Sequence, residues 1–337
     1  MTNELKEIID YVTNDSNQNK FVLATVVHLE GSSYRRPGVR MLINNNGKSF
    51  GNVSGGCVEK EVIRQSQSVF KSKIPKIIKY DGRFRLGCEG ILTILIEPFI
   101  LSKNFIAEFK TSIEKRLSIY SSSIYKLEYV EDLNLGTQIQ IGELNFSFRK
   151  NFSPKFHKEI LYFKQSFPPI FRLFIFGAEH DAVQLCRSAS LLGWEVTIVA
   201  PPDEDKTIHF FKGAKNFITP IIESFKTNFI DKQSAIVLMT HSFNNDIQYL
   251  ITLKETFPAY FGLLGPSKRR EMVIEKFLEK YPDCSIEFLD QLRGPAGLDI
   301  GAESPSEISI SILSEILSVI RQKNTLALST KNGNIHD

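Results

Sequence analysis

The residues Gly51–Val62, GNVSGGCVEKEV, combine a turn of small residues, a single thiol and the predicted start of a helix. We call residues 51–57 the thiol turn. Cys57 lies at the mouth of a helix predicted over 58–70, where the helix dipole favours the thiolate, the form of cysteine that acts as nucleophile or metal ligand. Consecutive backbone N–H groups at the same mouth attract anions, and here they belong to Ser54, Gly55 and Gly56. The alternative interpretation is a tight turn with a buried cysteine, because free cysteine packs as a small hydrophobe.

An arginine-rich loop, EGSSYRRPGVRM, precedes the thiol turn at residues 30–41. Its three guanidinium groups are rigid forks that suit phosphate or carboxylate, and they belong to Arg35, Arg36 and Arg40. The alternative is that loop arginines are simply solvated. Arg40 is the best placed of the three to point inward, because a strand is predicted to follow at 41–43. A hairpin turn over 45–47 then leads back toward the thiol turn, so the two segments are expected to lie one hairpin apart.

A second cysteine occurs in RLGCEGILTILIEPF, residues 85–99. Cys88 lies between two glycines, with an alternating strand behind it. If the strands of this half pair as neighbours, Cys57 and Cys88 face one cleft.

Composition narrows the class of protein. A length of 337 residues suggests two domains, and a net charge of +3 argues against an electrostatically driven nucleic-acid binder. The four cysteines form no CxxC pair, which argues against a structural zinc site or a disulfide framework. The N-terminus does not read as a signal sequence, and the most apolar stretch, 91–101, is interrupted by Glu97 and Pro98. We therefore expect a soluble cytoplasmic protein with no membrane span.

The first half of the chain predicts a mixed α/β domain. Apolar residues at helical spacing indicate a helix over 5–12, and a β-branched run indicates a buried strand over 21–28. A charged helix is predicted over 102–121, and two or three strands over 125–148. Because the next segment carries no chemical motif and ends in a diproline, we predict a first domain at 1–150 and a linker at 151–170.

The second half predicts a Rossmann-like parallel sheet. The strand RLFIF runs into a helix that ends before a second strand, a βαβ unit, and further strands are predicted at 215–219, 234–240 and 259–264. Its domain is expected at 171–324, with a tail at 325–337. A dinucleotide turn needs G-x-G-x-x-G, but Glu179 replaces its second glycine and Ala200 stands where an acidic ribose ligand is expected. Nucleotide binding is therefore expected to be weak.

Polar clusters follow the predicted parallel strands, at the edge where open α/β sheets bind ligands. A capping box over 304–307 is expected to be structural. The candidate ligand contacts in this half are His180, His241, Lys268, Arg269, Asp299 and Glu303.

Seven segments together resemble the xanthine dehydrogenase accessory protein family, XdhC/CoxI. They are GSSYRRPGVRM, GNVSGGCVE, LGCEGILTILIEP, FGAEHDAVQL, LMTHSFNND, FGLLGPSKRR and GPAGLDIGAESPSEI, and their order spans nearly the whole chain. The resemblance implies an N-terminal XdhC/CoxI domain before a Rossmann domain. It also implies a molybdenum-cofactor chaperone that supports cofactor sulfuration and inserts the cofactor into a xanthine dehydrogenase-type hydroxylase. Glu179 and Ala200 depart from the family pattern, in which glycine and aspartate are usual.

This resemblance and the residues suggest one assignment of roles. Cys57, with Cys88 as its candidate partner, would hold or shield the metal, while the arginine loop and the amides of the thiol turn would bind the terminal phosphate of the pterin. The expected partners are the hydroxylase, a cysteine desulfurase and a second copy of the chain, and a non-catalytic maturation factor is favoured over an enzyme. The rival is an NAD(P)-dependent oxidoreductase with His180 or His241 as acid/base. A third interpretation is a Rossmann scaffold for dimerisation or docking.

Overall fold

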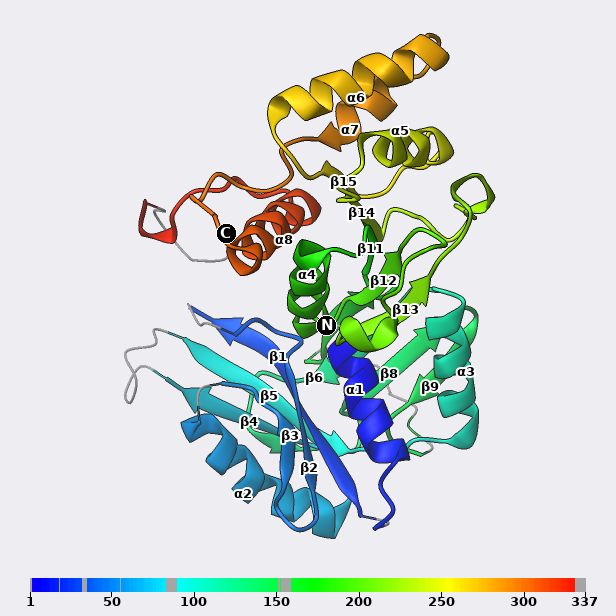
Figure 1. The fold of residues 1–337 in the computed structure, drawn as a ribbon. Coiled ribbons are helices and arrows are strands. Elements are labelled where there is room, and N and C mark those ends of the chain that lie inside the picture. The colour runs from blue at the N-terminus through cyan, green and yellow to red at the C-terminus, as the bar shows by residue number, and fades with distance from the viewer. Residues whose placement is uncertain are drawn as a thin grey trace. The chain divides into compact units, whose positions relative to one another are not determined.

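Three β-sheets organise the part of the chain that the computed structural model describes, which is residues 2–17, 19–31, 35–54, 56–82, 90–150, 152 and 159–330 (Figure 1). They fall into two units. Met1–Pro169 with Leu328–Asp337 form the N-terminal unit, and Ile170–Ala327 form the C-terminal unit. No helix in the described ranges combines the length and the apolar character needed to span a bilayer.

The first sheet of the N-terminal unit is antiparallel, with strand order β3-β2-β1-β5-β4-β7. Helix α2 (Cys57–Ser72) packs on one face of it through valines at helical spacing, Val58, Val62 and Val69, which are all buried. The strands are β1 (Phe21–Glu30), β2 (Arg40–Asn44), β3 (Ser49–Gly51), β4 (Lys76–Asp81), β5 (Ile91–Pro98) and β7 (Val130–Glu131).

The second sheet of this unit has the order β10-β6-β8-β9 and is also antiparallel. Its strands are β6 (Ile119–Tyr125), β8 (Gly136–Ile141), β9 (Leu144–Ser147) and β10 (Leu161–Phe167). Helices α1 (Thr2–Thr13) and α3 (Lys103–Glu114) join strands of both sheets in one apolar cluster that includes Leu5, Phe105 and Ile139.

Two expectations for this half were wrong. The helix predicted over 102–121 ends at Glu114, and β6 follows, because Ile119, Ser121 and Ser123 alternate onto one buried face with the period of a strand. The segment predicted as a linker at 151–170 contains β10, which pairs with β6 along its whole length.

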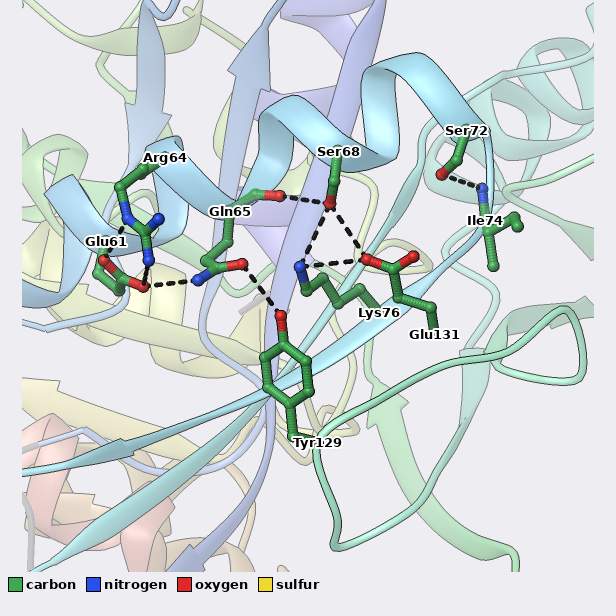
Figure 2. A network of polar contacts seen from close by, with 9 residues as sticks. All are labelled: Glu61, Arg64, Gln65, Ser68, Ser72, Ile74, Lys76, Tyr129 and Glu131. Carbon is green, nitrogen blue, oxygen red and sulfur yellow. Dashed lines mark hydrogen bonds and ion pairs between the residues drawn. The ribbon is translucent and has the colours of Figure 1, made fainter.

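A polar network joins α2 to the edge of the first sheet (Figure 2). The buried Lys76 lies 3.2 Å from a carboxylate oxygen of Glu131 and 3.3 Å from the hydroxyl of Ser68, and its ammonium group lies 5.0 Å from the ring centre of Tyr129. The Tyr129 hydroxyl donates to Gln65 on the same helix at 3.4 Å. These contacts fix α2, the helix that begins at the thiol turn, against β4 and β7.

The C-terminal unit is a parallel sheet in the order β13-β12-β11-β14-β15-β16, which confirms the Rossmann-like prediction. Helices α4 (His180–Leu191) and α8 (Pro305–Arg321) share one apolar cluster with the sheet, and α5 (Phe243–Thr252), α6 (Ser267–Lys280) and α7 (Ile286–Gln291) share a second. The strands are β11 (Arg172–Phe176), β12 (Glu195–Val199), β13 (Ala214–Ile218), β14 (Ser234–Leu238), β15 (Tyr260–Leu263) and β16 (Leu292–Arg293).

Candidate functional site

The arginine loop and the thiol turn meet in the N-terminal unit, one β2–β3 hairpin apart as predicted. A guanidinium nitrogen of Arg35 donates to the side-chain oxygen of Asn52 at 2.9 Å. The two segments and α1 enclose a cavity of about 210 Å³, whose polar lining includes Glu4, Glu7, Arg35, Arg40 and Asn52. Arg36 is exposed on the same loop. The structure thus brings two of the three predicted arginines to one cavity.

Glycine at position 51 allows the thiol turn to lie close to β2. Gly51 has φ +77°, and a Cβ atom built there would lie 2.7 Å from the carbonyl oxygen of Arg40. A side chain at this position would push the thiol turn away from β2, so the geometry of the cavity depends on this glycine.

Arg40 points inward, as its place at the start of β2 suggested. One of its terminal nitrogens donates to the carbonyl of Gly38 at 2.8 Å, and its guanidinium carbon lies 5.1 Å from the ring centre of Phe167. Its buried Nε has no hydrogen-bond partner among the described residues. Burial lowers the pKa of Arg40 to about 10, against the opposing charges of Glu97 and Glu4. Arg40 therefore remains cationic at neutral pH, with a donor left over.

The thiol turn already holds an anion, the carboxylate of Glu59. Its Oε1 accepts from the backbone N–H groups of Val53 at 3.1 Å and Ser54 at 2.6 Å, and its Oε2 accepts from Gly56 at 2.6 Å. The expectation that the amides of Ser54 and Gly56 are open to a ligand is therefore wrong in this conformation. The signal in the sequence was a glutamate three residues after the helix N-cap, which is the pattern of a capping box.

Of the two predicted thiols, only Cys57 is placed, and only by its backbone. Helix α2 begins at Cys57, with Gly56 as its N-cap residue, so the cysteine occupies the predicted helix mouth. The side chain of Cys57, and all of Gly55 and Cys88, lie outside the described residues. Among the residues that are described, no three histidine, cysteine, aspartate or glutamate side chains converge to hold a metal ion.

A buried carboxylate that is not among the predicted site residues lies in the first sheet, outside the cavity lining. Glu97 on β5 is 1% exposed, and it accepts from the hydroxyl of Thr137 at 2.5 Å and from the Thr137 N–H at 2.9 Å. Burial raises its pKa to about 7, against these hydrogen bonds and the charges of Arg149 and Arg40. The available indication in the sequence was an acidic residue inside an apolar strand, ILTILIEP.

The Rossmann sheet brings a second group of predicted residues to its carboxyl edge. β11 and β14 are neighbours at the point where strand order reverses, and the loops that follow them carry Glu179 and His241. His241 has φ +55°, in the left-handed region, and its Nε2 lies 3.5 Å from a carboxylate oxygen of Asp181. Glu179 lies 3.7 Å from the ammonium group of Lys206, and His180 is exposed at the first turn of α4.

Arg269, predicted as a ligand contact, instead holds a carboxylate of its own unit. Two of its guanidinium nitrogens donate to Asp246, at 3.0 and 2.5 Å, and Asp246 is 1% exposed. The hydroxyl of Thr240 donates to the other oxygen of Asp246 at 2.6 Å. This clamp joins the first turns of α5 and α6, and Lys268 beside it is exposed.

The last two predicted contacts lie on the loop before α8. Asp299 and Glu303 are both exposed. The capping box beside them is confirmed, because Ser304 accepts from the N–H of Glu307 at 3.4 Å and its own N–H donates to the Glu307 carboxylate at 2.8 Å.

Comparisons with known proteins agree with this two-unit architecture. Residues 16–81 match the family model described as the XdhC and CoxI family, and residues 173–316 match the one described as the XdhC Rossmann domain. A Bacillus subtilis (strain 168) protein, named as a probable subunit of xanthine dehydrogenase, is 28% identical over 319 residues, which cover 89% of this chain and 93% of that protein. The molybdenum cofactor insertion chaperone PaoD of Escherichia coli (strain K12) is 25% identical over 304 residues, 88% of this chain and 83% of that protein.

A solved structure shares the fold over nearly the full length. The crystal structure described as a xanthine dehydrogenase from Bacillus halodurans superposes with a TM-score of 0.77 and 26% sequence identity, covering 98% of this chain and 99% of that one.

Proposed function

Because this chain belongs to the XdhC and CoxI family, we propose that it is a chaperone of the molybdenum cofactor. In this role it binds the cofactor, supports its conversion to the sulfurated form and inserts it into a xanthine dehydrogenase-type molybdenum hydroxylase. Two relatives support the proposal by name, one as a molybdenum cofactor insertion chaperone and one as a probable xanthine dehydrogenase subunit.

The observation that carries the proposal is the cavity shared by the arginine loop and the thiol turn. A cargo with an anionic phosphate at one end and a sulfur-coordinated metal at the other needs cationic donors close to a thiol. Arg35 and Arg40 line the cavity, and the segment that forms its wall at Asn52 continues to Cys57. Guanidinium groups form strong, charge-assisted hydrogen bonds with phosphate oxygens.

Within this proposal the phosphate is bound by the arginines rather than by the turn. The carboxylate of Glu59 occupies the amides of Ser54 and Gly56, and a second anion there would be repelled. The proposed phosphate ligands are Arg40, whose Nε has no partner among the described residues, and Arg35, which also lines the cavity. Arg36, which is exposed on the same loop, is a further candidate.

The metal end is assigned to sulfur. Molybdenum accepts soft thiolate ligands, and a cysteine at a helix N-terminus has its thiolate form favoured. We propose Cys57 as the ligand or shield of the metal, with Cys88 as its partner. The proposed protein partners are the recipient hydroxylase, a cysteine desulfurase as sulfur donor, and a second copy of the chain.

Cofactor loading tests this function directly. The full chain is incubated anaerobically with molybdenum cofactor, separated from excess, and the retained cofactor is quantified after release. We expect about one cofactor per chain for the wild type, a loss of at least about tenfold in affinity for Arg40→Gln, and wild-type retention for Arg64→Gln, which alters an exposed arginine of α2 outside the cavity lining. A wild type that retains no cofactor would refute the proposal.

A further inference from the structure

Arg40 and Glu97 face the same interior space, between the two sheets of the N-terminal unit. Arg40 pairs in register with Thr25 of β1, and Glu97 pairs with Leu23 of the same strand. Residues two apart on a strand share a face, and so do cross-strand partners, so the guanidinium and the carboxyl group flank β1 on one side of the sheet. Arg40 lines the cavity, whereas Glu97 is buried and is not among the lining residues.

The surroundings of Glu97 are made almost entirely of uncharged groups. Thr137 of β8 supplies both hydrogen bonds, and the Thr137 hydroxyl lies 2.8 Å from that of Ser123 on β6. The backbone at Gly136 approaches closely, since a Cβ atom there would lie 3.2 Å from the carboxylate. No described cation lies within ion-pair distance of Glu97, so its charge state depends on more distant charges.

Those charges belong to two arginines, each of which also has an acidic neighbour. Arg40 on β2 and Arg149, which follows β9, both act on Glu97. Arg149 donates to the carbonyl of Leu135 at 3.4 Å, its guanidinium carbon lies 4.9 Å from the ring centre of Phe152, and it also feels the charge of Asp132. On the other side of Arg40, the exposed Glu4 of α1 acts from the cavity wall.

We propose that Glu97 is a positioning residue that controls how strongly Arg40 holds an anionic ligand in the cavity, strongly when the carboxyl group is protonated and weakly when it is ionised. The inference rests on the proposed function only in taking the cavity as the anion site. When Glu97 is neutral, no nearby carboxylate charge offsets the attraction between Arg40 and the anionic ligand. When Glu97 is ionised, it offsets that charge and repels the incoming anion across a poorly solvated interior.

The direction of the pH effect follows from this competition. The pKa of Glu97 is raised to about 7, so the protonated form dominates below that pH and the ionised form above it. Affinity for an anion is therefore high at pH 6 and falls as the pH rises through about 7. By linkage, an anion that binds beside Arg40 favours the protonated carboxyl group, so binding near pH 7 takes up a proton.

Sulfate is a suitable probe, because it stays doubly charged from pH 6 to pH 8, whereas a phosphate monoester itself titrates near pH 6. Sulfate binding to the full chain is measured by calorimetry at fixed ionic strength, in two buffers with different ionisation enthalpies at each pH. For the wild type we expect the Kd to rise about three- to tenfold from pH 6 to pH 8, with proton uptake near pH 7.

Three variants separate this role from a structural one. Glu97→Gln should keep the tight binding seen at pH 6 throughout the range and lose proton uptake. Glu4→Gln removes an exposed carboxylate from the same cavity and should retain the rise in Kd. Thr137→Val removes a hydrogen bond that favours the ionised carboxylate, so it should move the rise to higher pH.

A wild-type Kd that is constant from pH 6 to pH 8, or a Glu97→Gln variant that keeps the rise, would overturn the inference. If Glu97→Gln does not fold, Thr137→Val is the deciding variant. A Thr137→Val protein whose Kd rises at the same pH as that of the wild type would equally overturn the inference. Sulfate binding involves no molybdenum cofactor, so either result leaves the chaperone function to the loading assay.

Discussion

Replacing Glu59 tests whether its carboxylate holds the thiol turn together. Three backbone N–H groups, those of Val53, Ser54 and Gly56, depend on this one side chain. A hydrogen bond to a charged group contributes about 1.5–3 kcal/mol, but water can replace the carboxylate at the exposed Gly56. Counting the remaining two bonds near the lower end of that range, we expect Glu59→Ala to reduce the free energy of unfolding by about 3 kcal/mol.

Glu59→Gln should fall between the wild type and Glu59→Ala. Its amide oxygen can still accept from Val53 and Ser54, while its amide nitrogen would face the Gly56 N–H, and two donors repel. We expect a loss of about 1–2 kcal/mol. The matched control is Glu61→Gln, two residues along the same helix. The Glu61 carboxylate pairs with the exposed Arg64 and accepts from Gln65. An exposed i,i+3 pair contributes about 0.5 kcal/mol or less.

The assay is urea unfolding of the full chain, followed by circular dichroism and compared at unchanged m-value. Acetate, tested against chloride at equal ionic strength, should stabilise Glu59→Ala more than the wild type, because a free carboxylate can occupy the vacated amides. A Glu59→Ala variant within about 0.5 kcal/mol of the wild type would refute this account of the turn.

Three further predictions concern other parts of the chain. Cys57→Ala should lose most cofactor binding in the loading assay, whereas Cys186→Ala should retain it. Cys186 is buried in the C-terminal core, and burial raises the pKa of its thiol to about 12. Equal losses in the two variants would show that Cys57 is not the ligand. NAD and NADP should bind with Kd above about 1 mM by calorimetry, and Glu179→Gly should gain affinity; a micromolar isotherm for the wild type would instead favour the oxidoreductase interpretation. Arg269→Met should lower the free energy of unfolding by about 3 kcal/mol, because it leaves the buried Asp246 without its cation. The double variant with Asp246→Leu should recover part of that loss. A negligible effect of Arg269→Met in urea unfolding would contradict the proposed role of this ion pair.

Much of the fold could be predicted from the sequence, because most helices and strands show the hydrophobic pattern typical of their type. The valines of α2 recur at helical spacing, and the parallel strands of the C-terminal unit are continuous apolar runs. Strand β10 was missed because it is mostly exposed, so its sequence lacks a buried run, and only its pairing with β6 shows that it is a strand. A strand specified by its partner has little signal of its own.

The candidate site was predictable in its positions but not in its contacts. The spacing of the predicted hairpin indicated that the arginine loop and the thiol turn would be neighbours, but not that Arg35 and Asn52 make the contact. The glutamate three residues after the helix N-cap did indicate that Glu59 could reach back to the turn. The shared interior face of Arg40 and Glu97 could not be predicted, because it depends on which strands pair and in which register.

The most direct test of the central claim is transfer of cofactor to a recipient. The full chain is loaded anaerobically with molybdenum cofactor, freed of excess, and mixed with a cofactor-free xanthine dehydrogenase-type hydroxylase, and hydroxylase activity is followed against an equal amount of free cofactor. The chaperone function predicts faster and more complete activation from the loaded protein, and a reduced effect when Arg40→Gln is used in its place. Activation no better than with free cofactor would contradict it.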